Sequence, residues 1–259
     1  MTFILYFIIV LFATCIGASV GLSGGVIIKP LFDLVSVHKA DSISFFSSIA
    51  IVSMACVSIY KQYKNKAQFN FQITIFLALG SIVGGYTGNY LFSHVFNIFQ
   101  EATKGIQNFL LCTVLSILLI YTVNKDKIKT HRLKNTFVIF FVGLLMGNLS
   151  VFLGIGGGPL NLAILSLLFS FTSKESVVLS ISIIFFSQVS KLTTLFLENQ
   201  FAIYDTSVIP YIIIAAFIGG NIGSQINKKM SNKQVDKLYI LTLFGLILLT
   251  LFNILNQII

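Results

Sequence analysis

The sequence predicts an all-α, polytopic membrane protein with about eight full membrane spans and two short, broken helices. Its mean hydropathy is +0.94, and 56% of its residues are hydrophobic. Only 10% of the residues are charged, against roughly 25% in soluble globular domains. The third observation is the run Gly154–Pro159, Gly-Ile-Gly-Gly-Gly-Pro, which lies between two long apolar stretches and cannot hold a regular helix.

Apolar stretches of about twenty residues are long enough to cross the hydrocarbon core of a membrane. Spans of this kind are expected at residues 3–20, 42–60, 70–92, 106–123, 136–153, 176–194, 206–226 and 238–256. Two further apolar stretches, residues 26–37 and 159–171, directly follow glycine clusters and are too short for an easy crossing. We expect them to be half-helices or the return arms of hairpins.

Most of the positive charge lies in three short loops. The net charge is +9, and twelve of the seventeen Lys and Arg residues fall within residues 61–66, 125–134 and 228–237. Cytoplasmic loops carry such an excess, and all three lie on one face if each broken stretch enters the membrane and returns. We therefore expect a bacterial plasma membrane protein with cytoplasmic basic loops and both termini outside. Nucleic acid is not expected as a partner, because its binding patch would set these charges beside stacking aromatics.

The two halves of the chain repeat one another. Lys39 and Lys174 begin equivalent predicted spans, and the glycine-rich segment 84–89 corresponds to 219–224, both at an offset of 135 residues. The first half has an odd number of membrane-dipping legs, so the second half enters inverted. The expected organisation is a first transmembrane repeat, a cytoplasmic connector and a second transmembrane repeat, at residues 1–123, 124–135 and 136–259.

Each half carries a segment in which the helix is expected to break. The first is Gly21–Gly25, followed by Pro30, and the second is Gly154–Pro159. Unwound backbone at membrane depth is tolerated only where it is buried in protein or lines a watery cavity. Two such breaks in corresponding halves are typical of secondary transporters. The residues expected to interrupt the helices are Gly21, Ser23, Pro30, Gly154 and Pro159.

At these residues the sequence resembles the TauE/SafE family of sulfite-exporter-like membrane permeases. Its members have two similar halves, each beginning with a G-x-G-G-G type segment and a nearby proline. Gly154–Pro159 fits this pattern, whereas the first copy has Ser23 in place of the middle glycine and its proline at Pro30. The resemblance implies export or uptake of a small anion, such as sulfite, a sulfonate or a related sulfur or organic acid.

An anion carrier suits these breaks, because the N-terminus of a half-helix exposes backbone N–H groups and the positive end of a helix dipole. We expect alternating access, in which the two halves rock around a site between the breaks. The predicted substrate-binding residues offer backbone donors, polar side chains or a positive charge: Gly24, Gly25, Gly156, Gly157, Gly158, Asn148, Asn161, Ser48, Ser182, Gln188 and Lys191. For each polar side chain, a hydrogen bond between helices is the alternative role.

Charged residues inside apolar stretches are costly, and each is therefore a functional hypothesis. Lys191 either attracts the anion or extends to the nearby interface. Lys29 and Asp33 are four residues apart and share a helix face, so they form an ion pair or Asp33 carries a proton in a coupled cycle. The sequence has no nucleotide-binding loop, so a proton gradient or the membrane potential is the expected energy source. No cofactor, metal site or enzymatic activity is expected, and the oligomeric state is left open.

Two other functions fit parts of the sequence. Gly21-Leu22-Ser23-Gly24 matches the G-x-S-G pattern of rhomboid-like intramembrane serine proteases. That chemistry needs a buried base beside the serine, and His38, His94 and His131 are all expected in loops. An anion channel is the second alternative, but the sequence shows no regular series of charges for a selectivity filter.

Overall fold

The computed structural model describes residues 2–35, 38–64, 71–100 and 102–258. This part of the chain contains α-helices and short 3₁₀ helices but no strands, as expected for an all-α membrane protein. The α-helices are α1 (Thr2–Val20), α2 (Gly25–Val35), α3 (Ala40–Lys64), α4 (Phe71–Phe99), α5 (Ala102–Asn124), α6 (Thr136–Phe152), α7 (Gly158–Phe169), α8 (Ser173–Leu197), α9 (Ile209–Lys229) and α10 (Asn232–Ile258). The 3₁₀ helices are η1 (Lys125–Lys127), η2 (Gln200–Ile203) and η3 (Thr206–Val208).

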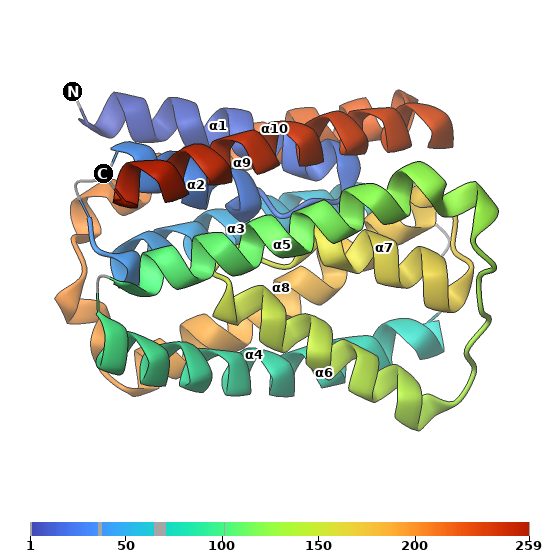
Figure 1. Ribbon diagram of the computed structural model, residues 1–259, viewed down its shortest axis with the longest axis horizontal. Coiled ribbons are helices and arrows are strands. Elements are labelled where there is room, and N and C mark those ends of the chain that lie inside the picture. The colour runs from blue at the N-terminus through green and yellow to red at the C-terminus, as the bar shows by residue number, and fades with distance from the viewer. Residues whose placement is uncertain (1, 36–37, 65–70, 101, 259) are drawn as a thin grey trace.

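Within the described residues, seven helices are long and apolar enough to cross a membrane: α1, α3, α4, α5, α8, α9 and α10. They run side by side along the long axis of the molecule (Figure 1). α6 is a shorter apolar helix of 17 residues, although a full span was expected there. It ends at Phe152 because the glycine break follows directly. The expected half-helices are present as α2 and α7.

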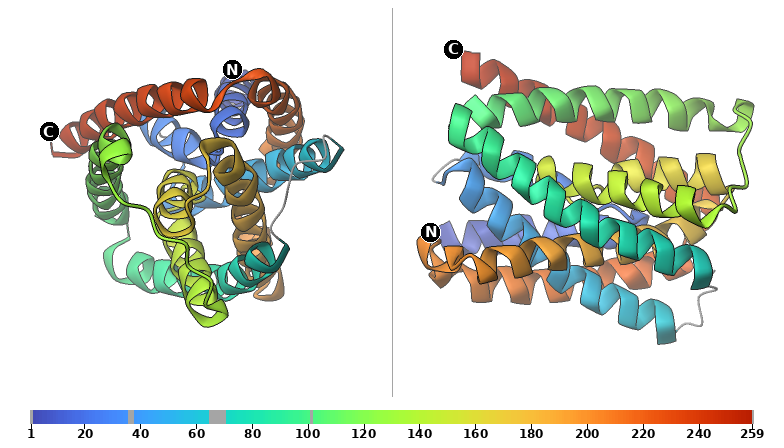
Figure 2. Two further views of the ribbon diagram at one scale, coloured as in Figure 1. Left: turned by 90° about the vertical axis from the view of Figure 1, so that its right-hand side faces the viewer. Right: turned by 90° about the horizontal axis from the view of Figure 1, so that it is seen from below.

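The two ends of the molecule carry different loops. The connector after α5 and the loops that follow α7 and α9 lie at one end, and both termini lie at the other (Figures 1 and 2). Lys125 of the connector forms an ion pair with Asp236 of α10, and Lys174 Nζ lies 3.3 Å from the Lys228 carbonyl oxygen. α1 starts at the terminal end and α6 starts at the connector end, so the two broken helices enter the molecule from opposite sides.

The first helix of each half packs against a helix of the other half. α1 lies along α9, and α6 lies along α4. Glycines allow the backbones to touch: a Cβ added at Gly84 would lie 2.1 Å from the Leu144 carbonyl oxygen, and one at Gly223 would lie 2.2 Å from that of Cys15. The paired glycine-rich segments of the two halves therefore serve close helix packing, which small residues permit in a membrane.

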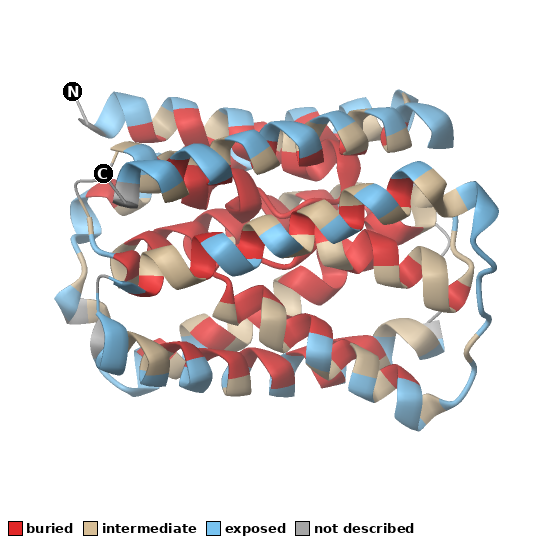
Figure 3. Cartoon of the chain, viewed as in Figure 1, coloured by how far each residue is buried: buried red, intermediate tan, exposed pale blue. Residues whose placement is uncertain are grey.

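Both helix breaks are buried in the centre of the protein. Every residue from Gly21 to Pro30 and from Leu153 to Pro159 is buried, and Figure 3 shows the buried residues concentrated between the outer helices. This is the surrounding that unwound backbone requires at membrane depth.

Positive φ angles end the helices at the breaks. Gly21 has φ +71°, and Gly154, Gly156 and Gly157 have φ angles of 66°, 73° and 66°. Side chains are disfavoured in this left-handed region, so glycine is the residue that fits these turns.

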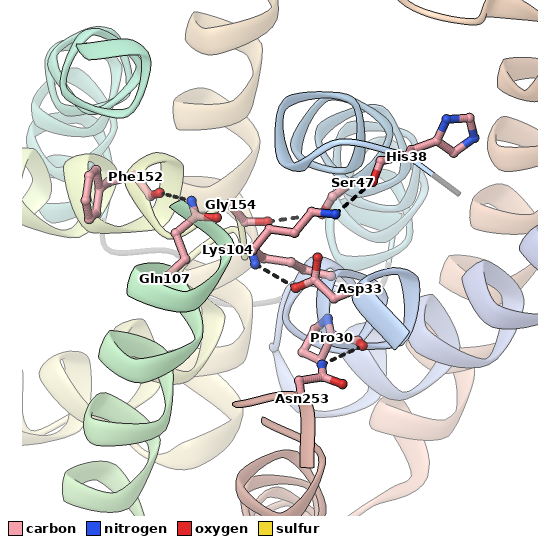
Figure 4. Close-up of polar contacts among 10 residues, drawn as sticks. Pro30, Asp33, His38, Ser47, Lys104, Gln107, Phe152, Gly154 and Asn253 are labelled. Carbon is pink, nitrogen blue, oxygen red and sulfur yellow. Dashed lines mark hydrogen bonds and ion pairs between the residues drawn. The ribbon is translucent and has the colours of Figure 1, made fainter. Parts of the chain in front are cut away.

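The prediction that Pro30 interrupts a helix is wrong. Pro30 lies inside α2, which has already begun with a hydrogen bond from Ile28 N to the Gly24 carbonyl oxygen. Proline fixes a φ angle close to that of a helix, so α2 loses one hydrogen bond and continues. Asn253 of α10 donates to the Pro30 carbonyl oxygen at 2.9 Å, which secures this turn (Figure 4). Pro159, in contrast, lies in the first turn of α7, where proline is well tolerated.

Candidate functional site

The two helix breaks are in direct contact. Ser23 Oγ donates a hydrogen bond to the Ile155 carbonyl oxygen. A Cβ added at Gly158 would lie 2.2 Å from the Ser23 backbone nitrogen, and one at Gly156 would lie 2.5 Å from the Ser23 side chain. The segments that interrupt α1–α2 and α6–α7 therefore meet backbone to backbone, and α2 and α7 both begin at this junction.

Neighbouring protein atoms cover the other predicted glycines in this conformation. A Cβ at Gly24 would lie 2.8 Å from the Thr14 side chain, and one at Gly25 would lie 2.6 Å from Ser47 Oγ. At Gly157 the nearest atom would be the Ser150 Cβ at 2.8 Å. Here the glycines serve tight packing, and their role as donors to an anion stays a prediction.

Polar side chains from three helices surround the start of the second break. Ser47 Oγ of α3 donates to the Gly154 carbonyl oxygen at 3.3 Å, and Gln107 Nε2 of α5 donates to that of Phe152 at 2.6 Å (Figure 4). A Cβ at Gly154 would lie 3.2 Å from Ser44 Oγ and 3.6 Å from the Lys29 side chain. Polar residues of α2, α3 and α5 thus meet along the short stretch from Phe152 to Gly154.

Lys191 of α8 points into the protein. Only 2% of it is exposed, and its Nζ lies 2.6 Å from Ser44 Oγ and 3.1 Å from the Ser44 carbonyl oxygen. The ammonium also lies 5.9 Å from the centre of the Phe92 ring. Neither of the ion pairs among the described residues includes Lys191. Two roles were considered for Lys191: attraction of the anion and extension to the membrane interface. Its burial fits the first role and not the second.

A cavity of about 210 Å³ leads to Lys191 from the end that carries the termini. Its polar lining comes from α3, α4, α8 and the segment before α9: Asp41, Asn89, Ser93, Asn97, Lys191 and Tyr204. Burial, together with the Asp41 and Glu198 carboxylates, raises the pKa of Tyr204 to about 12. The Tyr204 hydroxyl therefore keeps its proton at neutral pH. The volume is that of several water molecules, which suits a small ion.

Two predicted side chains make hydrogen bonds between helices. Asn148 Nδ2 of α6 donates to Thr87 Oγ1 of α4 at 3.0 Å. Gln188 Nε2 of α8 donates to Ser150 Oγ of α6 at 3.2 Å. For Asn148 this is the packing role that was considered as the alternative. Gln188 reaches Ser150, which itself covers Gly157, and so lies closer to the second break.

The remaining predicted polar residues have different surroundings. Ser48 and Ser182 donate to carbonyl oxygens within their own helices, at 2.8 and 3.2 Å. Asn161, in the first turn of α7, is fully buried, and neither its Oδ1 nor its Nδ2 has a hydrogen-bond partner among the described residues. A buried amide without a partner is costly, so Asn161 is the predicted residue with the greatest unused capacity to bind water or a solute.

Three residues that line the start of the second break were not predicted: Ser44 and Ser47, which lie at Gly154, and Gln107, which donates to the Phe152 carbonyl oxygen. A signal was present, because all three are polar residues within apolar stretches, and Ser44 and Ser47 lie one helical turn apart. Nothing local to the sequence indicated which of the many such serines face Gly154.

The surroundings of Ser23 do not support a protease. Its hydroxyl donates to a peptide carbonyl, and none of the described hydrogen bonds joins it to a histidine. The His38 ring packs against Tyr6 and Phe46, and His131 lies in the connector. The expectation that His94 lies in a loop is wrong: it belongs to α4, because this helix continues to Phe99.

Comparison with known proteins places the chain in a family. The family described as "Sulfite exporter TauE/SafE" matches residues 6–250 of the chain. The chain belongs to the TauE/SafE family. A relative from Bacillus subtilis (strain 168), "Probable membrane transporter protein YunE", is 26% identical over 263 residues, covering 91% of this chain and 92% of the relative. No solved structure matches the chain. This TauE/SafE protein is thus a sulfite-exporter-like membrane transporter, and the resemblance seen in its glycine motifs is confirmed.

Proposed function

We propose that this TauE/SafE protein is a secondary transporter, and primarily an exporter, of a small oxyanion such as sulfite, a sulfonate or a related sulfur or organic acid. The observation that carries this proposal is the buried ammonium of Lys191. Lys191 lines a cavity, and its Nζ donates a hydrogen bond to Ser44 Oγ, which lies beside Gly154 in the second break.

A buried charge is expensive unless an opposite charge or a full set of hydrogen bonds compensates it. The Ser44 oxygens that contact Lys191 are neutral, and Asp41 on the cavity wall forms no ion pair with it among those described. An anion in the cavity would supply the missing charge. Backbone N–H groups at the starts of α2 and α7 would add donors, and this is the proposed role of Gly24, Gly25 and Gly156–Gly158.

The transport mechanism we propose is alternating access between two inverted repeats, residues 1–123 and 136–259. It is supported by the exchange of partners, α1 with α9 and α6 with α4, which rotation of one half onto the other would produce. A difference between the two ends of the molecule also supports alternating access. A cavity leads in from the terminal end, whereas the Lys125–Asp236 ion pair joins the connector to α10 at the other end.

We propose that the basic loops lie in the cytoplasm of a bacterial cell and that both termini lie outside. The basic clusters at one end of the molecule support this orientation. The cavity that reaches Lys191 then opens outward, and a proton gradient or the membrane potential drives the cycle. A periplasmic reporter enzyme fused to the C-terminus should be active, and an active cytoplasmic reporter there would reverse the orientation.

Flux into liposomes tests the proposed function. The purified full-length protein is assayed with labelled sulfite, thiosulfate, sulfoacetate and small carboxylates, and saturable flux of at least one is expected. Lys191→Met should reduce this flux at least tenfold. Lys233→Met, which removes an exposed lysine of α10, is the matched control and should retain it. Undiminished saturable flux in Lys191→Met would remove Lys191 from the site, and conductance at single-channel rates would indicate a channel.

A further inference from the structure

A second buried lysine lies close to the same break, and it is paired with a carboxylate. Lys29 and Asp33 lie one turn apart in α2, and Lys29 Nζ contacts Asp33 Oδ2 at 2.9 Å. Their side chains are 1% and 2% exposed. The other carboxylate oxygen, Asp33 Oδ1, is buried and has no hydrogen-bond partner among the described residues. The side chains of the pair are therefore enclosed by protein, and one of the two carboxylate oxygens makes no hydrogen bond among the described residues.

Lys29 borders the peptide at Gly154, and Lys191 is linked to the same place through Ser44. A Cβ added at Gly154 would lie 3.6 Å from the Cδ and Cε atoms of Lys29 in α2. The same Cβ would lie 3.2 Å from Ser44 Oγ in α3. Ser44 in turn contacts Lys191 at 2.6 Å. The two lysines differ in one respect: Lys191 faces neutral oxygens, and Lys29 faces a carboxylate that cancels its charge.

We propose that Asp33 is the coupling proton site of the transporter and that it controls whether Lys29 is available to the anion. With Asp33 ionised, Lys29 is neutralised within α2. A proton from water binds the Asp33 carboxylate, the ion pair ends, and the ammonium of Lys29 keeps its charge beside Gly154. An anion then binds with Lys29 and Lys191, and one proton and one anion cross together. With a dianion the cycle carries one net negative charge, which the inside-negative membrane potential drives outward. This proposal rests on the proposed anion transport.

A structural role explains the pair less well. Replacing a buried ion pair by apolar residues of similar volume is often neutral or stabilising, so such a pair is weak evidence for stability. An unpartnered buried carboxylate oxygen adds a further desolvation cost. A site that must bind and release a proton, in contrast, needs an oxygen that is free to accept it.

The neighbouring helices bring further groups to this turn of α2. Tyr6 of α1 stacks on Phe32, and Lys104 of α5 donates to the His38 carbonyl oxygen at 2.9 Å, just before α3 (Figure 4). α10 contributes the uncharged Asn253 next to Pro30, α3 faces the start of α2 with Ser47, and its first turn carries Asp41. The ammonium at 2.9 Å would repel a sodium ion at Asp33, whereas a proton removes the negative charge.

The test uses the full-length protein in liposomes whose membrane potential is clamped at zero. Thiosulfate is the probe alongside sulfite, because it stays ionised from mildly acidic to mildly alkaline pH. A tenfold proton gradient should drive about tenfold accumulation of the anion in wild-type liposomes if one proton accompanies one anion. Exchange of labelled for unlabelled anion at equal pH on both sides is measured in the same preparation.

Asp33→Asn should abolish accumulation driven by the pH gradient and retain anion exchange, because Lys29 stays unpaired at every pH. The double variant Lys29→Gln/Asp33→Asn replaces the pair with two neutral amides and leaves no unpaired buried charge. It is the second test if the single variant misfolds, and it should also lose the coupling to the proton gradient. Asp33→Glu should keep it. Asp126→Asn, at an exposed carboxylate of the connector, is the matched control and should behave as wild type.

The outcomes separate the two proposals. Equal pH-driven accumulation in wild type and Asp33→Asn would overturn the role of Asp33 and leave anion transport standing. Accumulation that follows a sodium gradient instead of the proton gradient would also overturn it. If the wild-type protein neither exchanges nor accumulates any of the tested anions, the proposed function fails, and the coupling proposal falls with it.

Discussion

The Ser23 hydroxyl donates a hydrogen bond to the carbonyl oxygen of Ile155, and this contact ties the helix break of one half to the break of the other. Ser23 is fully buried and Ile155 is 2% exposed. Ser23 occupies the position at which the second break has Gly156, so the two breaks are not equivalent: the first supplies the donor and the second supplies the acceptor. The contact joins the two halves at the place around which they would rock in the proposed alternating-access mechanism.

Ser23→Ala should destabilise the protein and leave it active. The Ile155 carbonyl would lose a donor in a buried place, which costs about 1–3 kcal/mol. Thermal unfolding in detergent measures this loss, and anion flux in liposomes should stay within about twofold of wild type, since breaking one hydrogen bond removes no proposed substrate contact. A variant with wild-type stability and no flux would show that the hydroxyl acts directly on the substrate.

Alanine substitutions should separate the two reasons for glycine at the second break. Gly157→Ala forces a side chain into φ +66° and should cost about 1–2 kcal/mol from the backbone alone. Gly158→Ala keeps an ordinary φ but sets its Cβ 2.2 Å from the Ser23 nitrogen, so it should push the two breaks apart and eliminate transport.

Gly245→Ala is the matched control for both glycine variants. Beyond the nearby backbone of its own helix, no heavy atom of the described residues lies within 4 Å of a Cβ at Gly245, and this glycine is exposed in α10. Alanine should stabilise the helix there by up to about 1 kcal/mol. Unfolding temperature and flux are measured for all three. Wild-type flux in Gly158→Ala would contradict the idea that close contact of the breaks is part of transport.

Much of the fold could be predicted because its signals are local. The expected spans 3–20 and 238–256 lie within the long helices Thr2–Val20 and Asn232–Ile258, since apolar length largely determines where such helices form. Pro30 was misread because its effect depends on how many hydrogen bonds the helix loses, and here α2 loses one and gains a contact from α10.

The site was harder to predict, because it depends on which way each helix is rotated. In a span that is apolar on nearly every side, the sequence does not indicate which face meets protein and which meets lipid. Asn148 therefore appeared equivalent to other polar residues, yet it faces Thr87 in a packing interface. Lys191 was singled out for its charge, and its role toward an anion stays a prediction; its partner Ser44 lies 147 residues away and has no local signal.

Tyr204 should act as a hydrogen-bond donor without making transport pH-dependent. Its pKa is raised to about 12, because burial and the nearby Asp41 and Glu198 carboxylates disfavour the phenolate. The folded protein holds this proton more tightly than the unfolded chain does. Tyr204 therefore lowers the stability of the fold only in alkaline solution, as the pH rises above the ordinary tyrosine pKa of 10.0. Tyr204→Phe should therefore leave the pH profile of flux unchanged between mildly acidic and neutral pH. A shifted profile would give Tyr204 a part in proton transfer.

At the connector end, three polar side chains form a network. Lys125 forms an ion pair with Asp236, Lys125 Nζ lies 3.2 Å from Ser173 Oγ, and Ser173 Oγ donates to Asp236 Oδ1 at 2.6 Å. They cover a small cavity of about 20 Å³ that reaches Tyr239, whose hydroxyl donates to the Pro159 carbonyl oxygen at 2.6 Å. The network therefore lies between solvent and the start of α7. A partly exposed ion pair contributes only about 1 kcal/mol or less, so it can open and close within a transport cycle.

Loss of this ion pair should open the connector end. Ser176, buried on the wall of the small cavity, is replaced by cysteine in a background without the three native cysteines, and a membrane-impermeant thiol reagent reports its accessibility. Asp236→Asn should raise the labelling rate several-fold, because Lys125 loses its charged partner. The exchanged pair Lys125→Asp/Asp236→Lys restores opposite charges at the same place and should return the rate toward that of the parent. If labelling stays slow in Asp236→Asn, helix packing and not this contact limits access to Ser176, and the proposed alternating access would have to be controlled nearer the two breaks.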